Sequence, residues 1–129
     1  MSNKAPSSNQ PKYDLIERTA QFGENIIGYA QTIEKNNINL PLITQFIRSG
    51  TSIGANYMEA DAAESKKDFI HKLGIARKES KETMHWLRML AKANPYHKEI
   101  CRNLWKEAQA FVFIFSKIIN NSKIKKDKN

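Results

Sequence analysis

Cys101 is the most reactive side chain in the sequence, and a cysteine becomes a nucleophile when a neighbouring base activates it. His97 lies four residues earlier, which is about one turn away if this segment is a helix. No other histidine lies nearby, and a cysteine on a helix usually serves as a small core residue. We therefore expect no catalytic residues and no enzymatic activity.

Two short motifs contain residues that bind metals in helical bundles. Glu82-Thr-Met-His85 matches the Glu-x-x-His pattern of di-iron bundles, and Asp68-Phe-Ile-His71 matches it loosely. The two motifs fall within one predicted helix, about 21 Å apart, so they cannot share a metal within one chain. Because the other predicted helices offer no such motif, we expect no metal and no cofactor.

A row of cationic residues is the most informative pattern in the sequence. It recurs at helical steps of four and three, carries no acid, and runs for about 37 Å. Besides Gly74, this basic face comprises Lys67, His71, Lys78, Lys81, His85, Arg88 and Lys92. Exposed helix faces normally mix charges of both signs. A single-sign row is typical of nucleic-acid binding through phosphates, with little sequence specificity.

Other interpretations of polar rows remain open. The basic face could be an ordinary solvated surface, or it could meet an acidic protein or a membrane surface. A second row, on the segment before it, could line a binding pocket or form a hydrogen-bonded seam between helices; it comprises Gln45, Ser49, Ser52, Asn56 and Glu59.

Composition supports an anionic partner in the cytoplasm. The net charge is +8, and residues 65–94 carry eight lysines and arginines against three acids. With one cysteine, the chain cannot form an internal disulfide. The N-terminus lacks the apolar segment of a signal peptide, and the longest apolar run, AFVFIF at 110–115, is too short to span a membrane. We expect a soluble, cytoplasmic protein.

Helical periodicity predicts four helices, at about 14–34, 40–60, 66–93 and 95–121. The first carries a buried stripe of Leu15, Thr19, Phe22, Ile26, Tyr29 and Ile33. The buried stripe of the third is Phe69, Leu73, Ala76, Ser80, Thr83, Leu87 and Leu90. Asp14, Ser65 and Asn94 are the predicted N-caps. Short connections make neighbours antiparallel, which predicts an all-α, up-down-up-down four-helix bundle. Residues 1–12 are a predicted disordered arm, 13–121 the bundle, and 122–129 a basic flexible tail.

The stretch RSGTSIGANYMEA at 48–60 has the composition of a loop but the period of a helix. Apolar residues continue one face from Leu42 to Tyr57 without a break in phase. Gly50 and Gly54 lie on that face, although each costs about 1 kcal/mol relative to alanine in a helix. We expect them to permit close packing of another helix, and alanine at either position to be mild.

The last predicted helix is too apolar for a helix with a single buried side. Its predicted inner stripe is Ile100, Leu104, Ala108, Phe111, Phe115 and Ile118. Phe113 should point away from that stripe, because successive residues turn by about 100°. Ile114 and Trp105 could widen the same outward patch. We expect these three residues to form an oligomer interface.

The segment FIRSGTSIGANYMEADAAESKKDFIHKLGIARKESKETMHWLRML, at 46–90, closely resembles a family of four-helix-bundle proteins encoded in intervening sequences of bacterial 23S rRNA genes. The blocks at 48–60, 68–73 and 86–90 are distinctive together. The resemblance extends over about 13–120. It implies a bundle that assembles into a ring-like homopentamer and has no catalytic residues. It also implies kinship with the nucleic-acid-binding accessory protein of diversity-generating retroelements, whose partner is a reverse transcriptase.

The sequence therefore predicts a non-enzymatic, oligomeric bundle that binds RNA or DNA through the basic face. The alternative is a protein-interaction scaffold or an accessory subunit of a nucleic-acid enzyme.

Overall fold

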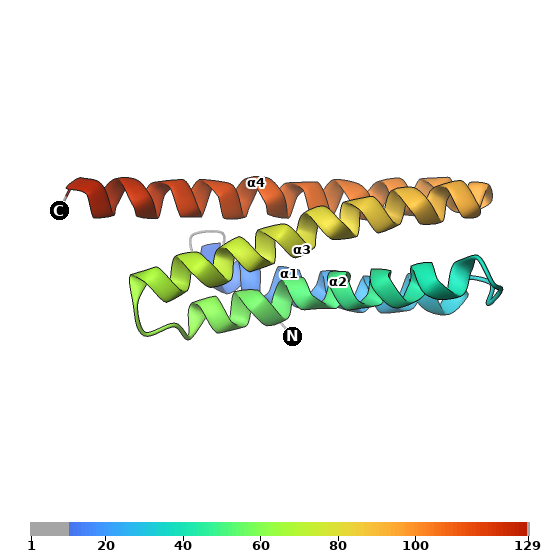
Figure 1. The fold of residues 1–129 in the computed structure, drawn as a ribbon, viewed down its shortest axis with the longest axis horizontal. Coiled ribbons are helices and arrows are strands. Elements are labelled where there is room, and N and C mark those ends of the chain that lie inside the picture. Colours follow the sequence, from blue (N-terminus) through green and yellow to red (C-terminus); the bar gives the residue numbers. More distant parts are fainter. Residues whose placement is uncertain (1–10, 129) are drawn as a thin grey trace.

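Four long helices form the fold in a computed structural model that describes residues 11–128, with side chains described for 15–123. The elements are α1 (Pro11–Thr32), α2 (Asn39–Asp61), α3 (Lys66–Ala93), the short 3₁₀ helix η2 (Pro95–His97) and α4 (Lys98–Lys128). Consecutive helices run antiparallel, as Figure 1 shows. The fold is the predicted all-α four-helix bundle, and residues 11–128 contain no strand.

The helices do not pack equally against one another. α3 lies between α2 and α4 and packs extensively against both, and α1 packs mainly against α2. α1 and α4 touch at few points. At one of them Arg18 donates two hydrogen bonds to Glu107, of 2.6 and 2.8 Å, and its guanidinium lies over the Phe111 ring. The last turns of α4 extend past the turn between α2 and α3 (Figure 1).

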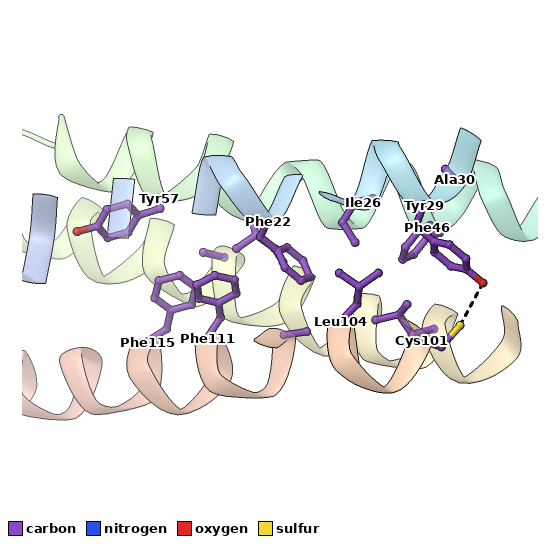
Figure 2. Packing of buried hydrophobic residues seen from close by; sticks show 14 of the residues in the cluster. Phe22, Ile26, Tyr29, Ala30, Phe46, Tyr57, Cys101, Leu104, Phe111 and Phe115 are labelled. Atoms are coloured by element: carbon purple, nitrogen blue, oxygen red, sulfur yellow. Dashed lines mark hydrogen bonds between the residues drawn. The ribbon is translucent and has the colours of Figure 1, made fainter. Parts of the chain in front are cut away.

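The core follows the predicted stripes of α1 and α3 closely. All six residues of the first stripe are buried, five on α1 and Ile33 directly after its end. On α3 Phe69 is only partly buried, while the other stripe residues are buried as expected: Leu73, Ala76, Ser80, Thr83, Leu87 and Leu90. Aromatic rings from three helices meet at the centre, where Phe22 packs edge-on against Phe111 and Tyr57 stacks on Phe115 (Figure 2).

α1 passes close over the two glycines of α2. A Cβ built at Gly50 would lie 2.7 Å from Ile26 Cγ1, and one at Gly54 would lie 3.2 Å from Thr19 Oγ1. The contact at Gly50 is closer than real Cβ atoms adopt, so the expectation that alanine would be mild does not suit this position.

The three predicted helix caps have different outcomes. α1 already begins at Pro11, so Asp14 lies inside the helix rather than before it. Asn94 holds the N-cap position of η2, but its side chain makes no N-capping bond. Its buried amide instead donates to the Leu90 carbonyl oxygen at the end of α3 and exchanges two hydrogen bonds of 3.0 Å with Asn39. The cap at Ser65 is confirmed, because its hydroxyl accepts a hydrogen bond from the Asp68 backbone N–H.

The boundaries at the two ends of the chain also differ from the prediction. Most of the predicted arm, residues 1–10, lies outside the described residues. α4 continues to Lys128 instead of ending at 121, so its helix includes most of the predicted tail. Within the described residues, no helix is long and apolar enough to cross a bilayer.

The predicted inner face of α4 is correct at its centre and wrong at both ends. Leu104, Ala108, Phe111 and Phe115 are buried. Ile100 is 42% exposed, and Cys101 takes its place in the core. Ile118 is partly exposed, and Ile119 is the buried residue. The reason is that steps of three and four both continue a helical stripe, so the pattern leaves either neighbour possible at each end.

Candidate nucleic-acid interface

The basic face lies on the solvent-exposed side of α3. The capping bond at Ser65 fixes where the helix starts, and the buried stripe from Leu73 to Leu90 turns the opposite side outward. All seven charged or titratable residues of the basic face are exposed: Lys67, His71, Lys78, Lys81, His85, Arg88 and Lys92.

Arg48 of α2 binds two of the three acids of α3, Glu79 and Glu82, on a flank beside the basic face. Its guanidinium donates to Glu79 Oε1 at 3.1 Å and to Glu82 Oε1 at 2.6 Å. Both glutamates are therefore engaged on the flank of α3 that faces α2. Among the described side chains, none of the five lysines and arginines of the basic face forms an ion pair. Its positive charge is left available to an external anion.

Two members of the polar row on α2, Ser49 and Glu59, hydrogen-bond to α3. Ser49 and Thr83 lie 2.9 Å apart through their hydroxyl oxygens, and both are buried. Glu59 is exposed and accepts a hydrogen bond of 2.6 Å from Lys72. This arrangement corresponds to the seam interpretation of the row.

Cys101 belongs to a small polar cluster inside the bundle. Tyr29 Oη lies 3.2 Å from Cys101 Sγ and 3.0 Å from His97 Nδ1, and Figure 2 marks the contact with the sulfur. Burial raises the pKa of the Cys101 thiol, although its hydrogen bond with Tyr29 partly opposes the shift. The thiol is therefore protonated near neutral pH, which is unfavourable for a nucleophile.

The two candidate metal motifs stay apart in the structure. Within the described residues, no three His, Cys, Asp or Glu side chains come together in a way that could hold a metal ion.

A groove between α3 and α4 adds three cations that the sequence prediction did not include. Arg88 of the basic face lies on one side of it, and exposed Lys98, Arg102 and Lys106 lie on the other. These α4 cations recur at steps of four, which is a signal that was present in the sequence. The spacing within one helix does not connect them to the basic face, because only the packing of α3 on α4 brings the two rows of cations together.

The three predicted interface residues of α4 have different environments. Phe113 is 65% exposed. Ile114 and Trp105 are partly buried and pack against the core. Trp105 also lines the groove between α3 and α4.

Comparison with known proteins places the chain among proteins of the same fold. A crystal structure of a protein with unknown function from the S23 ribosomal protein family, from Bacteroides thetaiotaomicron, is similar, with a TM-score of 0.78 and 30% sequence identity. The match covers 84% of this chain and 97% of that one. No curated protein matches the chain.

The family model described as "23S rRNA-intervening sequence protein" matches residues 12–117, which include α2, α3 with the whole basic face, and most of α1 and α4. Neither this description nor that of the similar structure names a catalytic activity. The chain belongs to the family of 23S rRNA-intervening sequence proteins.

Proposed function

We propose that the protein is a non-enzymatic binder of RNA or DNA that holds phosphates with the basic face of α3. The observation that carries the proposal is the row of exposed cations along one side of the helix, whose lysines and arginines form no ion pair with any side chain that the structure describes. Lysine and arginine contacts to phosphates release counterions and give affinity without reading bases. Binding should therefore tolerate many sequences.

The test is binding of a labelled polynucleotide at increasing salt concentration, measured by fluorescence anisotropy. Affinity should fall with a log–log slope of about −0.9 per phosphate contact for duplex DNA and about −0.7 for a single strand. The double variant Lys78→Gln, Lys81→Gln should weaken binding to all sequences equally and make the slope shallower by about two contacts.

A matched control removes the same charge elsewhere. Lys35 lies between α1 and α2, where it donates to backbone carbonyl oxygens, and Lys72 pairs with Glu59. The double variant Lys35→Gln, Lys72→Gln should keep most of the affinity. Equal losses in the two double variants would mean that net charge, not the basic face, drives binding.

Self-association is the second part of the proposal, and exposed Phe113 supports it. An aromatic ring that is 65% exposed on a helix otherwise packed in a bundle is a suitable centre for contact with a second copy. A closed ring such as a pentamer would bring Phe113 against a different face of the next subunit.

An accessory role beside a nucleic-acid enzyme is the second candidate function. Exposed apolar residues at one end of the bundle favour it, since Ile38 is 65% and Tyr96 is 74% exposed. The Asn39–Asn94 pair holds their two segments together. A wild-type chain that fails to bind heparin and polynucleotides at low salt would favour this candidate.

A further inference from the structure

The groove between α3 and α4 combines an apolar floor with a cationic rim. Its floor is formed by the Trp105 indole together with Leu87, Ala91 and Cys101. Its rim carries the four cations Arg88, Lys98, Arg102 and Lys106, and no acid lines it. The groove measures about 510 Å³, which lies within the usual range for small-ligand sites.

The cations around this groove are not neutralised by neighbouring side chains. All four are exposed, and among the described residues none of them forms an ion pair. The acid of α4 nearest to Lys106 in sequence, Glu107, is bound to Arg18 on the side that faces α1. The rim therefore suits a ligand with negative charge at its edges.

Two other grooves of the bundle lack this combination. The groove between α1 and α4 is of similar size, about 610 Å³, but it contains Glu17 and Glu107. The groove at the turn between α2 and α3 contains Glu59, Glu64 and Asp68. Neither is lined by a tryptophan, and the acids in both would repel an anion.

We propose that the α3–α4 groove seats an unpaired base of single-stranded nucleic acid, stacked on Trp105, with the flanking phosphates held by the cationic rim. A flat apolar body with anionic groups on both sides is the chemistry of a nucleotide within a strand, and aromatic side chains bind such bases with little sequence preference. The inference rests on the proposed function and deepens it: Arg88 belongs to both surfaces, so a strand on the basic face continues directly into the groove.

The decisive experiment compares three probes of equal length: a single-stranded oligonucleotide, a duplex, and a strand of abasic sites. All three carry phosphates, but only the first offers unpaired bases. Trp105→Leu should weaken the single strand about 5- to 100-fold. The same variant should leave the duplex and the abasic strand nearly unchanged. Trp105→Phe, which keeps an aromatic ring, should recover part of the loss.

Fluorescence gives a second readout that does not depend on removing Trp105. The only other tryptophan is Trp86, whose indole N–H is buried without a hydrogen-bond partner among the described residues. Trp86→Phe should therefore fold normally and leave Trp105 as the single reporter. Its emission should be quenched by the single strand and not by the abasic strand.

The outcomes separate this inference from the proposed function. In one outcome the single strand binds the wild type, and the double variant Lys78→Gln, Lys81→Gln binds it more weakly. If Trp105 fluorescence is then not quenched and Trp105→Leu keeps full affinity, the base site is wrong and the proposed function stands. If none of the three probes binds the wild type, both are wrong. Quenching of Trp105 by polyglutamate alone would also overturn both and identify an acidic polypeptide as the occupant.

Discussion

Ile26 of α1 lies directly over Gly50 of α2, so close that a Cβ at Gly50 would come within 2.7 Å of Ile26 Cγ1 and 2.9 Å of Cγ2. Both residues are buried, so the isoleucine has little room to move away. The missing side chain at Gly50 allows the two helices to approach, and this contact explains a glycine in the middle of a helix.

Alanine at Gly50 should destabilise the protein. The substitution gains about 1 kcal/mol of helix propensity, but overpacking a core position typically costs about 1–3 kcal/mol. We expect a net loss of free energy of unfolding, measured by urea denaturation. At Gly54 the nearest atom is Thr19 Oγ1 at 3.2 Å, so Gly54→Ala should be close to neutral.

Gly28 provides the control, because it lies on α1 with no atom within 4 Å of a Cβ built there. Gly28→Ala should stabilise the protein by up to about 1 kcal/mol. A Gly50→Ala variant as stable as Gly28→Ala would show that the close contact with Ile26 has no energetic consequence.

The buried pair of Asn39 and Asn94 joins the two turns at one end of the bundle. Each amide donates to the other at 3.0 Å, and both side chains are almost fully buried. Asn94→Ala should cost about 1–3 kcal/mol, because it leaves the Asn39 side-chain oxygen buried without its donor, while the Asn39 amide nitrogen keeps its bond to the Glu34 carbonyl. The double variant to alanine should cost less than the sum of the single variants.

A double-mutant cycle by urea denaturation measures this coupling. Asn103→Ala, at an exposed position of α4, serves as the control and should change stability by less than about 0.5 kcal/mol. Strict additivity of the two core variants would indicate that the amides do not depend on each other.

Stability should decline at alkaline pH. Burial raises the pKa of Tyr29, raises the pKa of Tyr57 to about 12, and raises the pKa of the Cys101 thiol. Since these groups bind protons more tightly when folded, the unfolded chain loses its protons first as pH rises. For each group the stabilisation is complete below its unfolded pKa, which is about 8.5 for the thiol and about 10 for the tyrosines. Above that value it falls by about 1.4 kcal/mol per pH unit until the folded pKa is passed.

Urea denaturation at about pH 7.5, 9.5 and 11 tests this dependence. Tyr29→Phe should be less stable than the wild type at the lowest pH, because the phenol contacts with His97 and Cys101 are lost. Its stability should fall less steeply between the two higher values. Parallel curves for the two proteins would exclude Tyr29 as a source of the pH dependence.

The sequence predicted the four helices, but it did not predict which residues are buried where that depends on packing against another helix. α1 and α3 carry apolar residues on one side, so the period fixes which face is buried. α4 carries apolar residues on several sides, so the period could not decide between Ile100 and Cys101. Tyr29, which contacts the Cys101 sulfur, lies 72 residues away and gives no local signal.

The same limit applies to the candidate site. The exposure of the basic face could be predicted from the apolar stripe on its opposite side. The ion pairs of Arg48 with Glu79 and Glu82 could not be predicted, because they depend on how α2 lies against α3. Asparagine is a residue type that often caps helices, but the side chain of Asn94 pairs with that of Asn39, which is distant in the sequence.

Phe113 should control assembly without affecting the fold of the subunit. The ring is 65% exposed, and its loss removes little from the core, so Phe113→Glu should keep the helical circular dichroism and thermal unfolding of an intact bundle. A charge placed in an apolar contact between copies carries a desolvation cost, so the variant should form a smaller assembly by multi-angle light scattering.

Tyr96→Glu is the matched control, since it places the same charge at an aromatic residue that is 74% exposed at the end of the bundle. An assembly reduced by Tyr96→Glu but not by Phe113→Glu would move the interface to that end, and a monomeric wild type would exclude self-association altogether.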